Sequence, residues 1–243
     1  MILTIVNSKG GVAKSTTAAA LAQAAAYRGR RALAVDLEPQ GDLSFCLKAD
    51  TSRPGVYEMM NGEAVTIQST ETGPDVIAAS PNLTTFTSSR GSARRLLAAL
   101  EPIKGRYDLI VIDTVPATGE LQYNALMASD GLVIPVTHDR GALGGLYMMI
   151  ETARRINPSL IAHGGAFIAR YSPRSNVARH MVQTIQETCE ALQVPYMGFV
   201  REGKDVQEAY TMQENLFDYL PRSKPAADYL ALYDRLMEGR PDE

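Results

Sequence analysis

The sequence has few cysteines and histidines, and neither residue type is spaced to bind a metal. Its two cysteines, Cys46 and Cys189, lie far apart and form no Cys-x-x-Cys pair. We expect them to be reduced, partly buried thiols of a cytosolic protein, since disulfides are rare in that compartment. The three histidines are scattered over the chain, at His138, His163 and His180. The sequence therefore gives no support for a cysteine-bound cluster or a histidine metal site.

Long apolar stretches and an excess of positive charge are also missing. No apolar run approaches the roughly 18 residues of a membrane span, and residues 2–6 are too short for the apolar core of a signal peptide. The net charge of −3 excludes a protein that is basic throughout, although a local patch of Arg and Lys can still bind nucleic acid. We expect a single α/β domain over residues 1–243, located in the cytoplasm and not bound to a membrane.

Short apolar runs alternate with stretches of helical pattern. Strands that are apolar throughout are typical of a mostly parallel, twisted sheet with helices on both faces, which binds ligands at the carboxyl ends of its strands. The expected strands span residues 2–7, 32–36, 75–79, 107–113, 131–136, 165–170 and 196–200. The expected helices span residues 15–28, 90–100, 119–128, 143–156, 175–192, 205–213 and 224–238. The polar region 49–75 is the hardest to assign, with one short helix expected around Gly55–Met60.

The beginning of the sequence has the layout of a phosphate-binding loop. The apolar run at residues 2–6 leads into a glycine-containing turn and then into Lys14-Ser15-Thr16, which opens an alanine-rich helix. Backbone N–H groups of such a turn converge on an anion, and the helix N-terminus adds a positive dipole. Lys14 can reach the β- and γ-phosphates of a nucleotide, and the Ser15 hydroxyl can bind Mg²⁺. The alternative is a glycine turn that binds no ligand.

Two departures from the common G-x-x-x-x-G-K-[ST] pattern characterise this loop further. Ala13 replaces the second glycine, which is tolerable where φ is negative, and a second lysine, Lys9, opens the loop. The resulting K-G-G-x-x-K-[ST]-[ST] pattern resembles the deviant Walker A motif of the ParA/MinD family of ATPases. The resemblance implies a P-loop NTPase fold that binds ATP or ADP with Mg²⁺. It also implies that Lys9 reaches across a two-fold interface to the nucleotide of a second copy; the alternative is a solvated loop lysine. The implied nucleotide-binding residues are Lys9, Gly10, Gly11, Val12, Ala13, Lys14, Ser15 and Thr16.

Two further motifs end expected strands. The D-L-E-P-Q-G segment that begins at Asp36 resembles the family's D-x-D-P-Q-G-N, and the strand ending at Asp113 resembles a Walker B strand. By this resemblance Asp36 and Asp113 lie near the Mg²⁺, with Ser15, and Glu38 positions the attacking water. Glu38 is one methylene longer than the family's aspartate. The implied catalytic residues are Lys9, Lys14 and Glu38.

The resemblance continues more loosely to the end of the chain. Arg174 falls on one of the family's DNA-binding arginines, although an ordinary surface arginine is an equally good interpretation. Asp205 occupies the place of the other arginine, so that Arg201 or Lys204 would have to substitute for it. By analogy, the base of the nucleotide lies where the loops at 169–173 and 201–205 approach each other.

The implied function is that of a DNA-partition ATPase for a plasmid or a chromosome. The ATP-bound homodimer would bind non-specific DNA, associate with the nucleoid, and be released when a centromere-binding partner protein stimulates its slow hydrolysis. Because the first strand begins at residue 2, we expect the form without an N-terminal helix-turn-helix domain. The alternatives are a related ATPase that positions a protein cargo, a MinD-like membrane-associated regulator, which the acidic tail at 232–243 disfavours, and a metabolic kinase or amide ligase.

Overall fold

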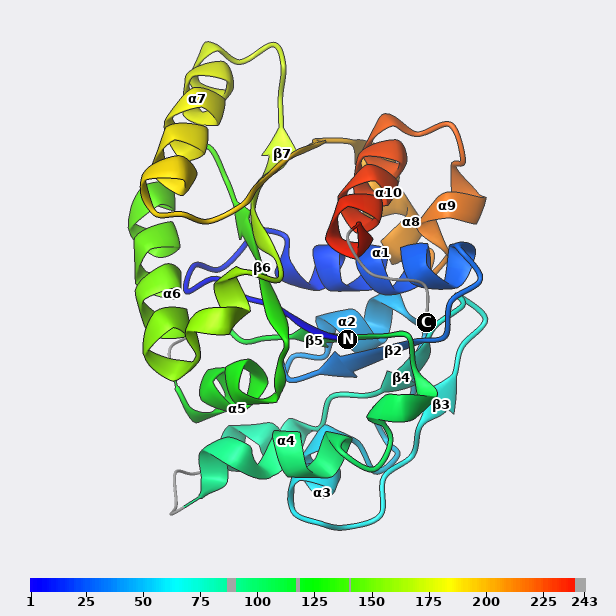
Figure 1. Ribbon diagram of the computed structural model, residues 1–243. Helices are drawn as coiled ribbons and strands as arrows, with labels where there is room; N and C mark the ends of the chain where they lie inside the picture. Colours follow the sequence, from blue (N-terminus) through cyan, green and yellow to red (C-terminus); the bar gives the residue numbers. More distant parts are fainter. Residues whose placement is uncertain (87–90, 117–118, 140, 239–243) are drawn as a thin grey trace.

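The computed structural model describes residues 1–86, 91–116, 119–139 and 141–238, and its centre is an eight-stranded sheet (Figure 1). The strand order is β3-β4-β2-β5-β1-β6-β7-β8. Neighbouring strands run parallel except β3 and β4, which are antiparallel. The strands are β1 (Ile2–Ile5), β2 (Ala32–Asp36), β3 (Gln68–Ser69), β4 (Asp75–Ile77), β5 (Leu109–Asp113), β6 (Gly131–Val136), β7 (Gly165–Tyr171) and β8 (Tyr196–Arg201).

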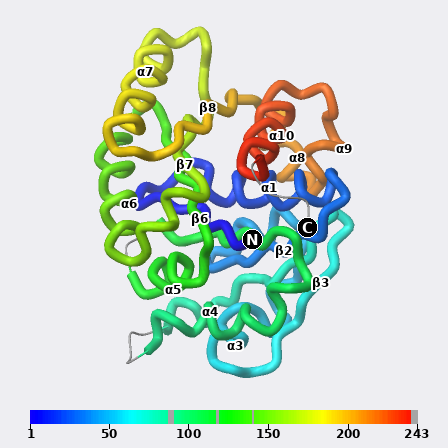
Figure 2. Tube along the Cα trace, in the orientation of Figure 1, coloured from blue at the N-terminus to red at the C-terminus, as the bar shows by residue number. Residues whose placement is uncertain are grey.

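Helices cover both faces of this sheet (Figure 2). The α-helices are α1 (Lys14–Tyr27), α2 (Asp42–Cys46), α3 (Val56–Met60), α4 (Arg95–Leu100), α5 (Glu120–Ala128), α6 (Ala142–Ile156), α7 (Asn176–Ala191), α8 (Lys204–Thr211), α9 (Leu216–Tyr219) and α10 (Lys224–Met237). Short 3₁₀ helices lie at η1 (Pro81–Thr85), η2 (Ser92–Arg94), η3 (Lys104–Arg106) and η4 (Pro158–Ile161). Among the described helices, none is both long enough and apolar enough to cross a membrane.

The core divides into two layers because successive strand residues point to opposite faces. Leu3 and Ile5 of β1 pack with α1, α2, α8, α9 and α10 on one face. Ile2 of the same strand packs with α3, α4 and α5 on the other face, where α6 and α7 cover β6 and β7. All residues of β1, β2, β5 and β6 are buried. The expectation of a parallel sheet covered on both faces is therefore confirmed.

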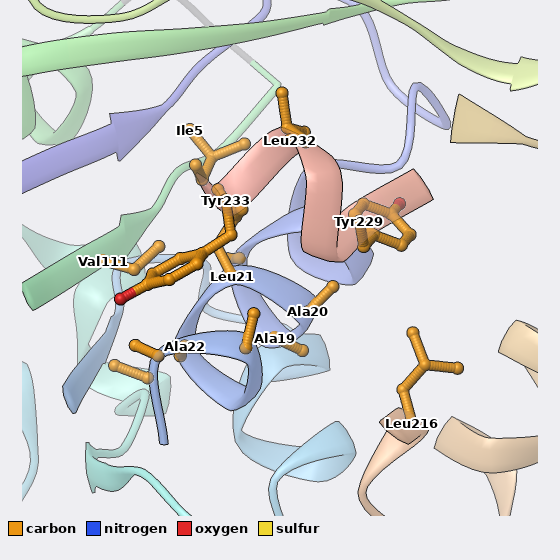
Figure 3. Packing of buried hydrophobic residues seen from close by; sticks show 14 of the residues in the cluster. Ile5, Ala19, Ala20, Leu21, Ala22, Val111, Leu216, Tyr229, Leu232 and Tyr233 are labelled. Atoms are coloured by element: carbon orange, nitrogen blue, oxygen red, sulfur yellow. The ribbon is translucent and has the colours of Figure 1, made fainter. Parts of the chain in front are cut away.

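Helix α1 is the framework for the first of these faces. It contains six buried alanines, and α10 packs against it through Tyr229, Leu232 and Tyr233 (Figure 3). Methyl side chains on one helix leave room for aromatic rings on the other, which fits close packing of protein interiors. Because α1 begins at Lys14, α10 is positioned directly relative to the phosphate loop.

The strands and helices expected from the sequence are present, with shifted ends. The first strand ends at Ile5 instead of residue 7, because the Asn7 side chain, instead of a backbone N–H, donates to the carbonyl oxygen of Pro135 at 2.8 Å. The strand expected over 107–113 begins at Leu109, and the helix expected over 90–100 begins at Arg95; residue 90 lies outside the described residues. The elements without a sequence prediction are short: α2, β3, α9 and the 3₁₀ helices. The short helix expected around Gly55–Met60 is α3.

Candidate nucleotide site

The loop between β1 and α1 lies at the carboxyl ends of the central strands. Gly11 and Ala13 have φ of 72° and 69°, both in the left-handed region. The expectation that alanine replaces glycine at a negative φ is therefore wrong. Ala13 precedes the first turn of α1, and its carbonyl oxygen accepts hydrogen bonds from Thr17 N at 2.9 Å and Thr17 Oγ1 at 2.6 Å. These bonds hold a conformation that costs a non-glycine residue roughly 1–2 kcal/mol.

Lys14 is buried at the floor of the loop. The residue is 6% exposed, and its Nζ donates to the carbonyl oxygen of Lys9 at 3.4 Å. Burial lowers the pKa of Lys14, while the carboxylates of Asp113, Glu38 and Asp42 act in the opposite direction. The ammonium group thus has acidic groups around it, and an added phosphate would compete with these carboxylates for the ammonium or share it with them.

Lys9 points away from this floor. Its Nζ pairs with a carboxylate oxygen of Asp139, in the loop after β6, and its side chain is 36% exposed. Thr137 Oγ1 donates to the other carboxylate oxygen of Asp139 at 2.8 Å. The backbone N of Lys9 donates to Asn7 Oδ1 at 3.0 Å. The two lysines of the loop are therefore directed to different places, Lys14 inward and Lys9 to the surface.

Two buried carboxylates lie side by side at the ends of β2 and β5. Asp36 and Asp113 are register partners in these strands, and both are 0% exposed. Asp36 accepts hydrogen bonds from Glu38 N at 3.0 Å, from Ser44 N at 2.8 Å and from Ser44 Oγ at 2.7 Å. Burial raises the pKa of Asp36 to about 6. This carboxylate organises the turn from β2 into α2.

Asp113 is less well satisfied. Its Oδ1 accepts from Thr114 N at 2.9 Å, but its buried Oδ2 has no hydrogen-bond partner within the described part of the chain. Burial raises the pKa of Asp113 well above its usual value, and the negative charge of Asp36 adds to this effect, whereas the nearby Ser15 hydroxyl and the Lys14 ammonium act in the opposite direction. A buried, unpartnered carboxylate oxygen is costly in an apolar surrounding unless a cation or a water binds it. The donor set therefore fits a hard cation such as Mg²⁺, which prefers oxygen ligands and keeps several waters.

The phosphate loop opens into a cavity of about 720 Å³. On the loop side it is lined by residues of the loop, by Glu38 and by Pro116. Glu38 is partly exposed to the cavity; burial raises the pKa of its carboxyl, and Lys14 opposes that effect. On the far side the cavity is lined by the ends of β7 and β8 and by α8 and α10. The volume falls in the range of small-molecule and cofactor pockets.

The loops after β7 and β8 meet at this far side, as the sequence predicts. Glu202 N donates to the carbonyl oxygen of Tyr171 at 2.9 Å, and the carboxylate of Glu202 pairs with Arg170 at 2.9 Å. Both charged side chains line the cavity. Arg170 has a φ of 56° beside a register shift between the two strands, and such irregularities re-aim side chains next to binding sites.

Sequence reasoning missed the part of the lining that comes from short or amphipathic helices. These residues are Phe45, Cys46, Val206, Gln207, Tyr210, Thr211 and Tyr229. No motif marks them, because they reach the cavity only through the packing of α2, α8 and α10 around α1. Helix period alone would have placed Val206 and Tyr210 on one face of α8. The two cysteines are free thiols; Cys46 is half-buried at the cavity and Cys189 is buried.

The basic residues considered for DNA binding are not equivalent. Arg174 is exposed in the turn before α7, and Lys204 is exposed at the start of α8. Arg201, in contrast, lines the cavity and is paired with Asp228. Asp205, for which the resemblance implies an arginine, accepts a hydrogen bond from the Ser223 hydroxyl.

Comparison with known proteins agrees with this geometry. A family model described as an AAA domain matches residues 1–162. The sporulation initiation inhibitor protein Soj of Bacillus subtilis (strain 168) is 34% identical over 95% of this chain and 96% of its own length. The chromosome partitioning protein ParA of Myxococcus xanthus (strain DK1622) is 32% identical over 98% of this chain and 88% of its own length.

Among solved structures, cobyrinic acid a,c-diamide synthase from Mycobacterium smegmatis, with bound ADP and magnesium, superposes with a TM-score of 0.79 at 26% identity. The match covers 98% of this chain and 96% of that chain. The phosphate loop, the two strand-end carboxylates and nearly full-length similarity to Soj and ParA lead to one conclusion. The chain belongs to the ParA/Soj family of P-loop ATPases.

Proposed function

We propose that this protein is a DNA-partition ATPase that dimerises when it binds ATP and Mg²⁺. The observation that carries the proposal is the site itself: Lys14 and Glu38 line one cavity, and the orphaned Oδ2 of Asp113 lies buried at the end of the adjacent strand. A bound triphosphate would satisfy the N–H groups of the phosphate loop and the Lys14 ammonium.

Within this site, each residue has a distinct role. Residues 10–16 bind the phosphates, and Lys14 neutralises charge on the β- and γ-phosphates. Ser15 and Asp113 would hold the Mg²⁺, and the adjacent Asp36 fixes the turn that carries Glu38. Mg²⁺, when bound, neutralises charge that develops on the transferred phosphoryl group. Glu38 orients the attacking water, since its carboxylate faces the cavity on the phosphate side.

The role of Lys9 is to contact the nucleotide of a second copy. Its side chain lies at the surface beside Asp139, so it can exchange that partner for a phosphate when two subunits approach. An exposed ion pair is worth only about 0–1 kcal/mol, which a contact with a highly charged phosphate group would exceed. ATP is then part of the dimer interface, and hydrolysis dissolves it.

The dimer would bind DNA through Arg174 and Lys204, which are exposed, with Arg201 contributing less because Asp228 already neutralises it. Such backbone contacts carry no sequence information, so a separate centromere-binding partner protein would supply specificity and stimulate the slow hydrolysis. Association with the nucleoid in the cytoplasm follows from this mode of binding.

The experiment that tests the proposal measures binding to non-specific DNA with and without ATP at about 50 and 200 mM salt. ATP-dependent binding that weakens with salt and is lost in Lys9→Ala and Arg174→Ala is the expected result. Arg155→Ala is the control, because Arg155 is also an exposed arginine but lies on α6, away from the proposed surface. DNA binding that ignores ATP, or that survives both substitutions, would contradict the proposal.

One observation favours a second candidate, a ParA-like ATPase that positions a protein cargo. Asp205 removes a positive charge from the surface where the family has an arginine. ATP-dependent dimerisation without any DNA binding in the same experiment would favour this second function.

A further inference from the structure

The segment 201–205, part of which forms the far wall of the cavity, is hydrogen-bonded at both of its ends to α10 or its N-cap. At the first end, Asp228 of α10 holds Arg201 by three hydrogen bonds. Its Oδ2 accepts from Arg201 N at 2.9 Å and from Nε at 2.7 Å, and its Oδ1 accepts from Nη2 at 2.6 Å. The Asp228 side chain is 13% exposed and the Arg201 side chain 32%, so that the carboxylate of this pair is largely shielded from water. A bidentate pair with a further backbone bond fixes direction as well as position.

At the second end, the Ser223 hydroxyl donates to Asp205, and Ser223 Oγ also accepts from Ala226 N as the N-cap of α10. Between the two ties, Gly203 has no room for a side chain. A Cβ placed there would lie 2.1 Å from Asp205 Oδ1 and 2.6 Å from Pro225 Cγ. The segment 201–205 therefore contacts the N-terminal part of α10 through Arg201, Gly203 and Asp205.

Helix α10 also contacts the phosphate-loop helix. Tyr229, next to Asp228, lines the cavity, and its hydroxyl lies 3.5 Å from Thr17 Oγ1 of α1. The close packing of α10 on the alanines of α1 completes this connection (Figure 3). Helix α10 thus contacts both the phosphate-loop helix and the part of the opposite wall that includes Arg201, Glu202 and Gly203.

We infer that Asp228 is a positioning residue for the nucleoside half of the bound nucleotide. It holds segment 201–203 at the distance from the phosphate loop that a nucleoside spans. The inference rests on the proposed nucleotide site. It also gives Asp205 a role: this residue anchors the wall, in place of an arginine directed at DNA.

The inference predicts a selective effect on two ligands that share the same phosphate loop. Mg²⁺-ATP uses both ends of the cavity, whereas Mg²⁺-triphosphate, the inorganic anion, uses the loop alone. Calorimetric titration of Asp228→Ala should show a loss of about tenfold in ATP affinity, as expected for the loss of a charged hydrogen-bonded pair. Triphosphate affinity should stay within about twofold of the parent protein.

Asp234→Ala is the matched control. Asp234 lies on the same helix and forms a similar two-bond pair with Arg28, but neither residue lines the cavity. It should change neither affinity. Asp228→Asn keeps an oxygen for Arg201 N and should show an intermediate loss of ATP affinity, which guards against misfolding of the alanine variant.

An equal fall in ATP and triphosphate affinity in both Asp228 variants would overturn the inference, because it would indicate general damage to the fold. Unchanged ATP affinity in both variants would overturn it as well. If the parent protein binds neither ligand, the proposed nucleotide site itself is wrong, and the inference falls with it.

Discussion

At the scale of single residues, the site places several acidic groups around one buried ammonium. Asp36, Asp113, Glu38 and Asp42 all act on Lys14 or on one another. Asp36 is satisfied by three hydrogen bonds, whereas Asp113 keeps an orphaned oxygen. The protein thus tolerates a cost in the ligand-free state that nucleotide and Mg²⁺ would remove, as is common where function and stability compete.

Asp113→Asn should therefore stabilise the ligand-free protein. The substitution keeps the oxygen that accepts from Thr114 N and removes a buried negative charge whose desolvation costs about 1–3 kcal/mol at neutral pH; the net gain is smaller by the attraction that Lys14 loses. Folding raises the pKa of Asp113 above its ordinary value of 3.8. The carboxylate therefore begins to destabilise the fold as pH rises above 3.8, and the cost grows until pH passes the raised pKa. The gain should shrink toward acid pH. Urea unfolding from pH 4 to 8 measures it.

The same variant should lose the Mg²⁺ dependence of ATP binding. Asp108→Asn is a suitable control, because Asp108 precedes the same strand but pairs with Arg31 at the surface. A stability gain that is constant over the whole pH range would contradict the argument from the buried charge.

Glu38→Ala should bind ATP but hydrolyse it about 10²–10⁴-fold more slowly, because the residue that we propose to orient the water is missing. Glu38→Asp restores the shorter side chain of the family and should keep measurable turnover. Phosphate release under saturating ATP, compared with ATP affinity, separates chemistry from binding. Turnover in Glu38→Ala at the parent rate would show that another group handles the water.

At the scale of secondary structure, the sequence predicts those elements whose signal is local. Apolar runs identify β1, β2, β5 and β6, and the glycine turn with Lys14 marks the start of α1. Helix α2 has no such signal: it spans five residues, begins after Gly41 and depends on the Asp36–Ser44 hydrogen bonds. The left-handed Ala13 is likewise imposed by the loop and by Thr17, against the preference of alanine.

The residues of the candidate site also differ in whether the sequence gives a local signal for them. The motifs predict the residues of the phosphate loop, Glu38 and Asp113, because their chemistry requires fixed spacing. Other residues of the site lie on helices that follow the motifs by more than 90 residues: Gln207, Asp228 and Tyr229. Only tertiary packing brings these residues to the cavity or its wall. Amphipathic helices with ordinary composition give no indication of such a role.

The contact between α1 and α10 yields a prediction about an element. Ala20 is fully buried in the core cluster that α1 shares with α10, so Ala20→Leu should overpack this region and lower the free energy of unfolding by about 1–3 kcal/mol. Ala231→Leu is the control, since Ala231 is exposed on α10. Chemical denaturation of both variants measures the difference. Equal stability of the two variants would mean that α1 and α10 are loosely packed.

At the scale of the whole molecule, the two lysines of the phosphate loop connect ligand binding to association. Lys14 Nζ donates to the Lys9 carbonyl oxygen, and the Lys9 side chain pairs with Asp139 beyond β6. A nucleotide that draws Lys14 toward its phosphates removes one of the bonds that hold the loop. The pairing of Lys9 with Asp139 then remains as a contact within the subunit that competes with the proposed contact to a second copy.

Asp139→Asn should therefore favour the ATP-bound dimer. Loss of an exposed ion pair worth about 0–1 kcal/mol predicts an increase of up to about fivefold in dimer affinity, with little change in ATP affinity of the monomer. Sedimentation velocity over a concentration series with a non-hydrolysable ATP analogue measures this. Glu71→Gln, which breaks the exposed pair with Lys48, should have no effect. The gain should also vanish when Lys9→Ala is added, because Lys9 is the group that the substitution releases; a gain that persists in the double variant would place the effect of Asp139 elsewhere.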